Sequence, residues 1–134
     1  MRILVTGHAG FIGARTCEKL ITQGENVIGI DSFNPGLYSS TLKRSRDLDL
    51  RNLRGSFHSI ELDLSGITRR TLEELRITHI INFAALPGQV KSWHFLQQYL
   101  DSNVLGTQRL LEAVTSYGKI EKFVQISTSS VYGK

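Results

Sequence analysis

Short apolar runs recur along the chain and alternate with stretches whose apolar residues follow a helical period. The runs occupy residues 2–6, 26–31, 57–62, 79–84 and 122–128. Runs this short suit strands that are buried on both faces of a parallel sheet. Helices are predicted between them over 11–23, 40–53, 68–76 and 92–117, with Ser40 or Thr41 capping the second and a bend near Asp101 in the last. This alternation predicts right-handed βαβ units and a doubly wound parallel α/β sheet with helices on both faces.

Three glycines follow the first run at a spacing of three residues each. Gly7 would allow a tight turn, Gly10 would let the backbone approach a pyrophosphate, and Gly13 would let the following helix pack against the strand. The start of that helix would add free N–H groups and a partial positive charge. Strand, glycine turn and helix together predict a Rossmann-type dinucleotide site.

Asp31 is a second signal for a dinucleotide, because it stands at the end of the second predicted strand. It follows Gly13 by 18 residues, near the interval of about 20 expected for the acid that holds the ribose hydroxyls. A carboxylate at this point would repel the extra phosphate of NADP, so the predicted cofactor is NAD. The alternative interpretation is a glycine-rich turn in a flavodoxin-like sheet, with Asp31 as an ordinary loop acid.

Charge and cysteine content limit the cellular compartment and the classes of partner expected for this 134-residue domain. The net charge is +4, and basic residues concentrate between Lys43 and Arg54. Because no aromatic residues are interleaved there for base stacking, a solvated helix face or a basic loop near a sugar nucleotide is favoured over a nucleic-acid surface. Cys17 is the only cysteine, and neither a signal peptide nor a membrane-length apolar run is found. These features predict a cytoplasmic protein without a metal, nucleic-acid or membrane partner.

Several motifs stand where predicted strands end: Thr6 to Gly13, Asp31, Asp63-Leu64, Asn82 to Ala85 and Ser127 to Gly133. A further motif, Asp101 to Thr107, lies within the last predicted helix. Taken together, they resemble those of the extended short-chain dehydrogenases/reductases. Within that superfamily the chain is most similar to the nucleotide-sugar epimerases and dehydratases, nearest to the UDP-glucuronate and UDP-glucose 4-epimerase branches. The resemblance covers the whole chain.

The resemblance implies a set of site residues. The implied cofactor-binding residues are Gly7, Gly10, Phe11, Ile12, Gly13, Asp31, Asp63, Leu64, Ala84, Ala85, Leu86 and Asn103. Ser92 and Ser129 would bind the sugar, and Thr128 would be catalytic by hydrogen-bonding the reacting hydroxyl. From the residues alone, a hydroxyl that caps the end of a strand is favoured over catalysis for Thr128, and residues 84–88 could equally form a plain turn.

By the same resemblance, the protein is an enzyme, an NAD-dependent UDP-sugar 4-epimerase that acts by transient oxidation at the sugar C4. It would be a homodimer at full length. A tyrosine, its pKa lowered by a neighbouring lysine and the cofactor's charge, would take the hydroxyl proton. The alternatives are a 4,6-dehydratase or UDP-glucuronate decarboxylase and, in another class, a catalytically inactive NAD-binding module.

The chain departs from the family in lacking the Tyr-x-x-x-Lys pair that supplies this base. None of its four tyrosines has a lysine four residues later. We therefore expect residues 1–134 to be an incomplete NAD-binding domain, truncated after about the fifth strand and inactive alone. The substrate-binding C-terminal domain would be absent. We also expect the last strand and long helix to expose apolar surface, which would make the chain marginally stable or self-associating.

Overall fold

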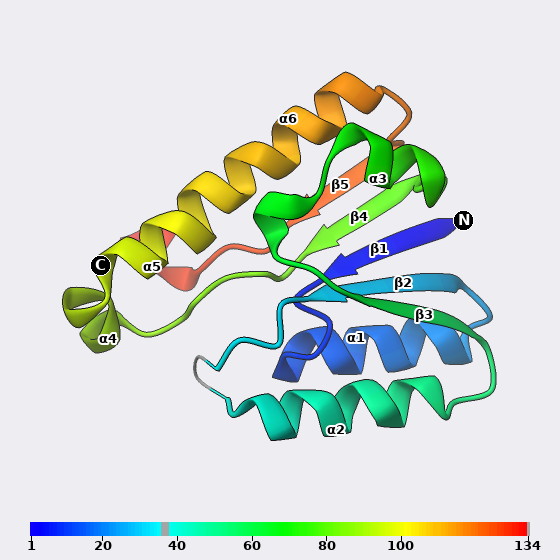
Figure 1. Cartoon of the computed structure of the whole chain (residues 1–134), viewed down its shortest axis with the longest axis horizontal. Helices are drawn as coiled ribbons and strands as arrows, with labels where there is room; N and C mark the ends of the chain where they lie inside the picture. Colours follow the sequence, from blue (N-terminus) through cyan, green and yellow to red (C-terminus); the bar gives the residue numbers. More distant parts are fainter. Residues whose placement is uncertain (36–37, 134) are drawn as a thin grey trace.

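A single parallel sheet organises the protein, whose computed structural model describes residues 1–35 and 38–133. The strand order is β3-β2-β1-β4-β5, with all pairs parallel. The strands are β1 (Arg2–Thr6), β2 (Asn26–Asp31), β3 (Ser56–Glu61), β4 (His79–Asn82) and β5 (Lys122–Gln125). Their carboxyl ends therefore share one edge (Figure 1). The predicted α/β fold class is confirmed.

Helices cover both faces of this sheet, as predicted. α1 (Phe11–Thr22) and α2 (Ser40–Arg51) lie on one face, and α3 (Arg69–Glu74) and α6 (Thr107–Tyr117) on the other (Figure 1). β1 supplies both cores: Ile3 and Val5 pack with α1, whereas Leu4 packs with the helices opposite. Each such buried side chain contributes roughly 1.5–3 kcal/mol. This explains why β1 has a continuous apolar run and no alternation.

Two predicted boundaries shift because side-chain caps and strand pairing set them. Ser39, rather than Ser40 or Thr41, caps α2, and its hydroxyl accepts a hydrogen bond from the Leu42 N–H at 3.2 Å. The last predicted strand, 122–128, pairs with β4 only as far as Gln125. Beyond that point the chain turns into the short 3-10 segment η3 (Ser129–Tyr132).

The predicted single helix over 92–117 is wrong, because the segment breaks into four pieces. These are α4 (Gln89–His94), α5 (Leu96–Tyr99), the π-helix η2 (Leu100–Gly106) and α6. Phe95 leaves the helical region between α4 and α5, with φ −129° and ψ 37°. The predicted bend at Asp101 corresponds to the π-helix, a wider turn that often accompanies functional sites.

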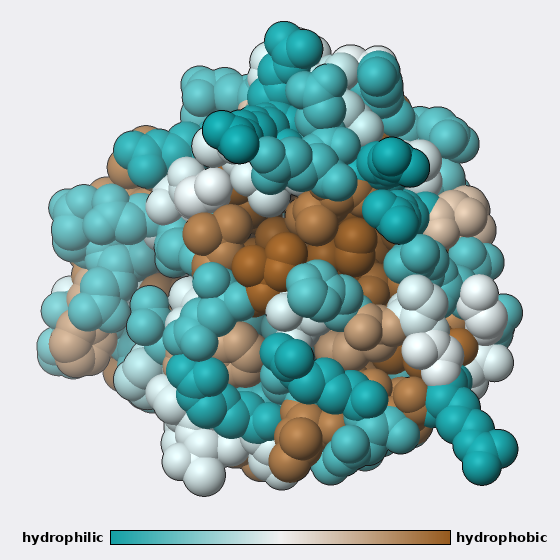
Figure 2. All heavy atoms as spheres, turned by 45° about the vertical axis from the view of Figure 1, so that its right-hand side comes forward, coloured by the Kyte–Doolittle hydropathy of each residue, from teal (hydrophilic) through white to brown (hydrophobic). Residues whose placement is uncertain are grey.

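Large apolar side chains remain on the surface of this segment and of η3. Val90, Trp93 and Tyr132 are 76%, 85% and 88% exposed, and Leu96, Leu100 and Val104 are also exposed. The predicted exposure of apolar surface is therefore confirmed, whereas its effect on stability and association stays a prediction. Figure 2 brings forward a different face, from the right-hand side of Figure 1, on which other hydrophobic side chains gather between hydrophilic ones.

Candidate functional site

The turn after β1 has the close backbone packing that the glycine spacing predicts. The Gly7 N–H donates to the Ile30 carbonyl at 2.7 Å, and Gly7 has φ +68°. A Cβ on Gly7 would lie 2.9 Å from the Ala84 nitrogen, and one on Gly13 would lie 2.3 Å from the Gly7 oxygen. The steric roles expected of Gly7 and Gly13 agree with this geometry.

The start of α1 forms an open cradle for an anion. Gly10 is its N-cap and offers no side chain to the first turn, which also contains no acidic residue. The first N–H groups of a helix have no partner within the helix and carry a partial positive charge. Phe11 and Ile12 are exposed on this turn. A helix start of this kind can bind an anion such as a phosphate group.

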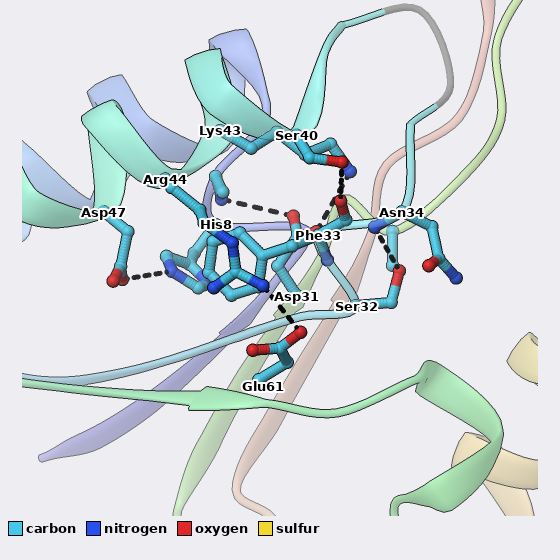
Figure 3. A network of polar contacts seen from close by, with 12 residues as sticks. His8, Asp31, Ser32, Phe33, Asn34, Ser40, Lys43, Arg44, Asp47 and Glu61 are labelled. Atoms are coloured by element: carbon cyan, nitrogen blue, oxygen red, sulfur yellow. Dashed lines mark hydrogen bonds and ion pairs between the residues drawn. The ribbon is translucent and has the colours of Figure 1, made fainter.

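Asp31 lies at the end of β2, directly beside this turn, and is 6% exposed. One carboxylate oxygen, Oδ1, accepts from the Phe33 N–H at 2.8 Å and from Lys43 Nζ at 3.0 Å. The other, Oδ2, accepts from the Ala9 N–H at 3.3 Å. Figure 3 shows the Lys43 side chain of α2 reaching Asp31. A carboxylate at this place can accept hydrogen bonds from the ribose hydroxyls of a nucleotide.

Basic side chains of α2 gather around Asp31. Arg44 lies over the Phe33 ring at 4.7 Å and forms an ion pair with Glu61 at 2.9 Å. The Arg46 guanidinium stacks over the Tyr38 ring at 4.5 Å. This placement favours the interpretation of the basic stretch as a loop and helix beside a nucleotide, although Arg44 itself is also a solvated surface residue.

A buried hydrogen bond joins the glycine turn to α2. The fully buried His8 ring contacts Asp47 through Nε2 at 2.9 Å, and Asp47 also accepts from Arg51 at 2.8 Å (Figure 3). Burial alone would raise the pKa of Asp47, but the polar neighbours Ser59, His8 and Arg51 outweigh it and lower that pKa. A Cβ on Gly29 would lie 2.5 Å from the His8 ring, so glycine there makes room for the imidazole.

A row of polar side chains forms the floor of the site. The Thr6 hydroxyl donates to Asn82, and the Asn82 amide donates to Gln125 at 2.8 Å. The Ala84 N–H donates to the same Thr6 hydroxyl oxygen, Oγ1, at 3.3 Å. Thr6 and Asn82 are buried, so this row ties the carboxyl ends of β1, β4 and β5 together.

Asn103 holds the loop that follows β4. Its Oδ1 accepts from the Leu86 N–H at 2.7 Å, and its Nδ2 donates to the Leu86 carbonyl at 3.0 Å. The Tyr99 hydroxyl donates to the Pro87 carbonyl at 2.7 Å. Ala84 is half-buried and Ala85 is exposed on the same loop. Asn103 therefore supports the backbone at residues 84–86, where the resemblance expects the cofactor channel.

The remaining predicted residues lie on separate elements. Asp63 caps the short 3-10 helix η1 (Leu64–Gly66) through the Ser65 N–H at 2.9 Å, and Leu64 is buried in the core. Ser92 lies on α4, and Thr128 is exposed beyond β5. The side chain of Ser129 lies outside the described part of the structure.

Sequence reasoning missed Lys43, His8 and Asn82 as parts of this site. Their partners are 12, 39 and 76 residues away along the sequence, so local spacing does not predict these pairs. Lys43 was visible only as one member of a basic stretch.

Two further features of the described residues concern metal-binding clusters and membrane-spanning helices. Within residues 1–35 and 38–133, no group of three or more His, Cys, Asp or Glu side chains could hold a metal ion. In the same ranges, no helix is long and apolar enough to cross a bilayer.

The sequence profile of the NAD dependent epimerase/dehydratase family matches residues 3–134. The chain belongs to this family. An uncharacterised UDP-glucose epimerase of Bacillus subtilis is 44% identical over the whole chain, and the UDP-glucuronate 4-epimerase of Thermodesulfobacterium geofontis is 38% identical over 96% of it. The chain spans only 42% and 40% of the lengths of these two relatives.

A solved structure of an epimerase of this family superposes on the entire chain. It is the UDP-glucuronic acid 4-epimerase of Bacillus cereus in complex with UDP-glucuronic acid and NAD, with 39% identity and a TM-score of 0.89. The chain covers 42% of that protein. The family and the fold that the sequence motifs indicated are thus both confirmed.

Proposed function

We propose that residues 1–134 form the dinucleotide-binding part of an NAD-dependent UDP-sugar 4-epimerase of the UDP-glucuronate or UDP-glucose type. The observation that carries the cofactor site is Asp31, buried beside the open cradle of the glycine turn. Support for the 4-epimerase reaction comes from the relatives, among them the Bacillus cereus enzyme.

In this proposal, each part of the site has a defined task. The turn from Gly7 to Gly13 and the first N–H groups of α1 hold the pyrophosphate, and Asp31 accepts from the adenosine ribose. The loop at 84–86, held by Asn103, lines the path of the nicotinamide. NAD, when bound, supplies a hydride acceptor for the sugar C4.

The sugar side of the site is incomplete in these 134 residues. Thr128 would hydrogen-bond the reacting hydroxyl, while Ser92 and Ser129 would bind the sugar. The chain lacks a Tyr-x-x-x-Lys pair and spans 42% of the Bacillus cereus enzyme. The base and the substrate-binding domain would therefore come from polypeptide beyond residue 134, in a cytoplasmic enzyme that is a homodimer at full length.

Calorimetric titration of the chain with NAD and, separately, with NADP tests the cofactor site. We expect NAD to bind more tightly than NADP, and Asp31→Ala to weaken NAD binding by about tenfold or more. Asp49→Ala is the matched control, because it removes an exposed carboxylate from α2. Tighter binding of NADP than of NAD would contradict the role of Asp31.

A turnover assay tests the sugar side. The chain with NAD and UDP-glucuronate should form no 4-epimer, because no base is available to take the hydroxyl proton. Epimerisation by these 134 residues would show that the base is present after all. The second candidate function is a catalytically inactive NAD-binding module, which the missing Tyr-x-x-x-Lys pair favours. A full-length protein that binds NAD and epimerises no UDP-sugar would support it.

A further inference from the structure

Lys43 is the described cation in direct contact with Asp31. It stands in the first turn of α2, its side chain is 15% exposed, and its Nζ lies 3.0 Å from Asp31 Oδ1 (Figure 3). An ammonium group has three donor hydrogens and no acceptor, and Asp31 takes one of the three. The other two are available to a ligand beside the carboxylate.

The two oxygens of Asp31 differ in what they can still accept. Oδ1 already receives two hydrogen bonds, from Phe33 and from Lys43, which fill its two lone pairs. Oδ2 receives only the longer bond from Ala9, at 3.3 Å. The carboxylate therefore has one well-placed free acceptor for a ribose diol that presents two hydroxyl groups.

We propose that Lys43 binds the adenosine ribose together with Asp31, one hydroxyl donating to Asp31 and the other accepting from the Lys43 ammonium. This inference rests on the proposed cofactor site and adds a residue that determines its specificity. A donor and an acceptor side by side match a vicinal diol, in which each hydroxyl group both donates and accepts. Hydrogen bonds of this kind to charged groups are the stronger ones.

The same contact sets how strongly NADP is rejected. A lone carboxylate repels a 2′-phosphate, but a cation 3.0 Å from Asp31 offsets most of that repulsion and would itself attract the phosphate. The chain would prefer NAD by a modest margin that depends on Lys43. Replacing Lys43 with a neutral side chain would weaken NADP binding more than NAD binding.

Calorimetry with NAD, its adenosine 2′-deoxy and 3′-deoxy analogues, and NADP tests this inference. For the unaltered chain, we expect each deoxy analogue to bind about five- to tenfold more weakly than NAD. In Lys43→Met, NAD itself should bind about tenfold more weakly, and one analogue should now equal NAD. Lys43→Arg should restore sensitivity to both hydroxyls.

Lys19→Met is the control, because it makes the same substitution at an exposed lysine in the last turn of α1. It should leave sensitivity to both hydroxyls intact. If Lys43→Met lowers the affinity for NAD and both analogues by one common factor, Lys43 only holds Asp31 in place and the inference is overturned. Normal NAD affinity in Lys43→Met overturns it too, while the proposed function stands if Asp31→Ala still weakens NAD binding by about tenfold or more. No binding of NAD to the unaltered chain overturns both.

Discussion

The amino-terminal region (residues 2–62) and the carboxyl-terminal region (residues 84–132) differ in the partners of their polar groups and in the exposure of their apolar side chains. In the first, the buried carboxylates of Asp31 and Asp47 have charged partners. A cluster of apolar side chains is buried between the sheet and α1 or α2, whereas Phe11, Ile12 and Leu48 are exposed on the helix surfaces. In the second, Trp93 and Tyr132 are largely exposed. Buried polar groups can thus have partners near one edge of the sheet while large apolar side chains remain exposed near the other edge.

The difference follows from what each region must contact. In the proposed cofactor site, the glycine turn, Asp31 and the basic side chains of α2 all come from the amino-terminal region. The relatives that match this chain are more than twice as long. The exposed side chains of the carboxyl-terminal region are the larger energetic liability, because contiguous apolar surface favours association.

The largest expected effect comes from truncating one large side chain in each region. Leu4→Ala should lower the free energy of unfolding by about 2–5 kcal/mol, because Leu4 is fully buried in the centre of the sheet. Trp93→Ala should change it by less than about 0.5 kcal/mol, because the ring is 85% exposed. Urea unfolding of both variants measures the two losses in free energy of unfolding. Equal losses would contradict the expected difference between the regions.

A double-mutant cycle tests the fit of His8 against Gly29 in the amino-terminal region. Gly29→Ala should cost about 1–3 kcal/mol, since its Cβ would lie 2.5 Å from the His8 ring. In the His8→Ala background this clash disappears, so the added cost of Gly29→Ala should fall by about 1 kcal/mol or more. Additive costs in thermal unfolding would mean that the imidazole moves aside freely.

Self-association should depend on the carboxyl-terminal region alone. Trp93→Lys should weaken any association of the chain severalfold, because a charge then interrupts the exposed apolar surface. Leu48→Lys, at a 58% exposed site on α2, should leave association unchanged. Sedimentation across a concentration series measures both, and a chain that is monomeric throughout with a sharp thermal transition would refute the expected liability.

Acid stability should report on Asp47. Its pKa in the folded chain lies below the ordinary value of 3.8, so the charged form is favoured by folding. That contribution is fully present above pH 3.8 and is lost as the pH falls through the lowered pKa. Asp47→Asn should therefore be less stable than the unaltered chain at neutral pH, and the gap should close in strong acid. A gap that is constant with pH would exclude this linkage.

The smallest expected effect concerns Cys17, a buried residue of α1. Burial, with a further contribution from the charge of Asp47, raises the pKa of its thiol to about 12. The thiolate is the reactive form, so the native chain should react with a disulfide reagent far more slowly than the urea-unfolded chain. Equal rates would show that the amino-terminal core opens readily.

Local spacing predicted the parts of the site that backbone geometry controls. Gly7, Gly13 and Asp31 were identifiable because a strand, a tight turn and a helix fix the intervals between them. The contacts of Lys43 with Asp31 and of Asn82 with Thr6 were not, because they depend on which elements pack together in three dimensions. The break at Phe95 also escaped prediction, since apolar periodicity continues across it and only the backbone geometry departs from a helix.

The position of β1 in the sheet has a consequence for how the protein is made. β1 is synthesised first, yet it lies in the middle, and its pairing with β4 joins residues 76 positions apart. On the ribosome, β1 can pair with β2 early, but its other side stays without a neighbour until residue 82 has emerged. Until then the growing chain carries an unpaired apolar strand edge, and such an edge favours misassembly and aggregation during synthesis.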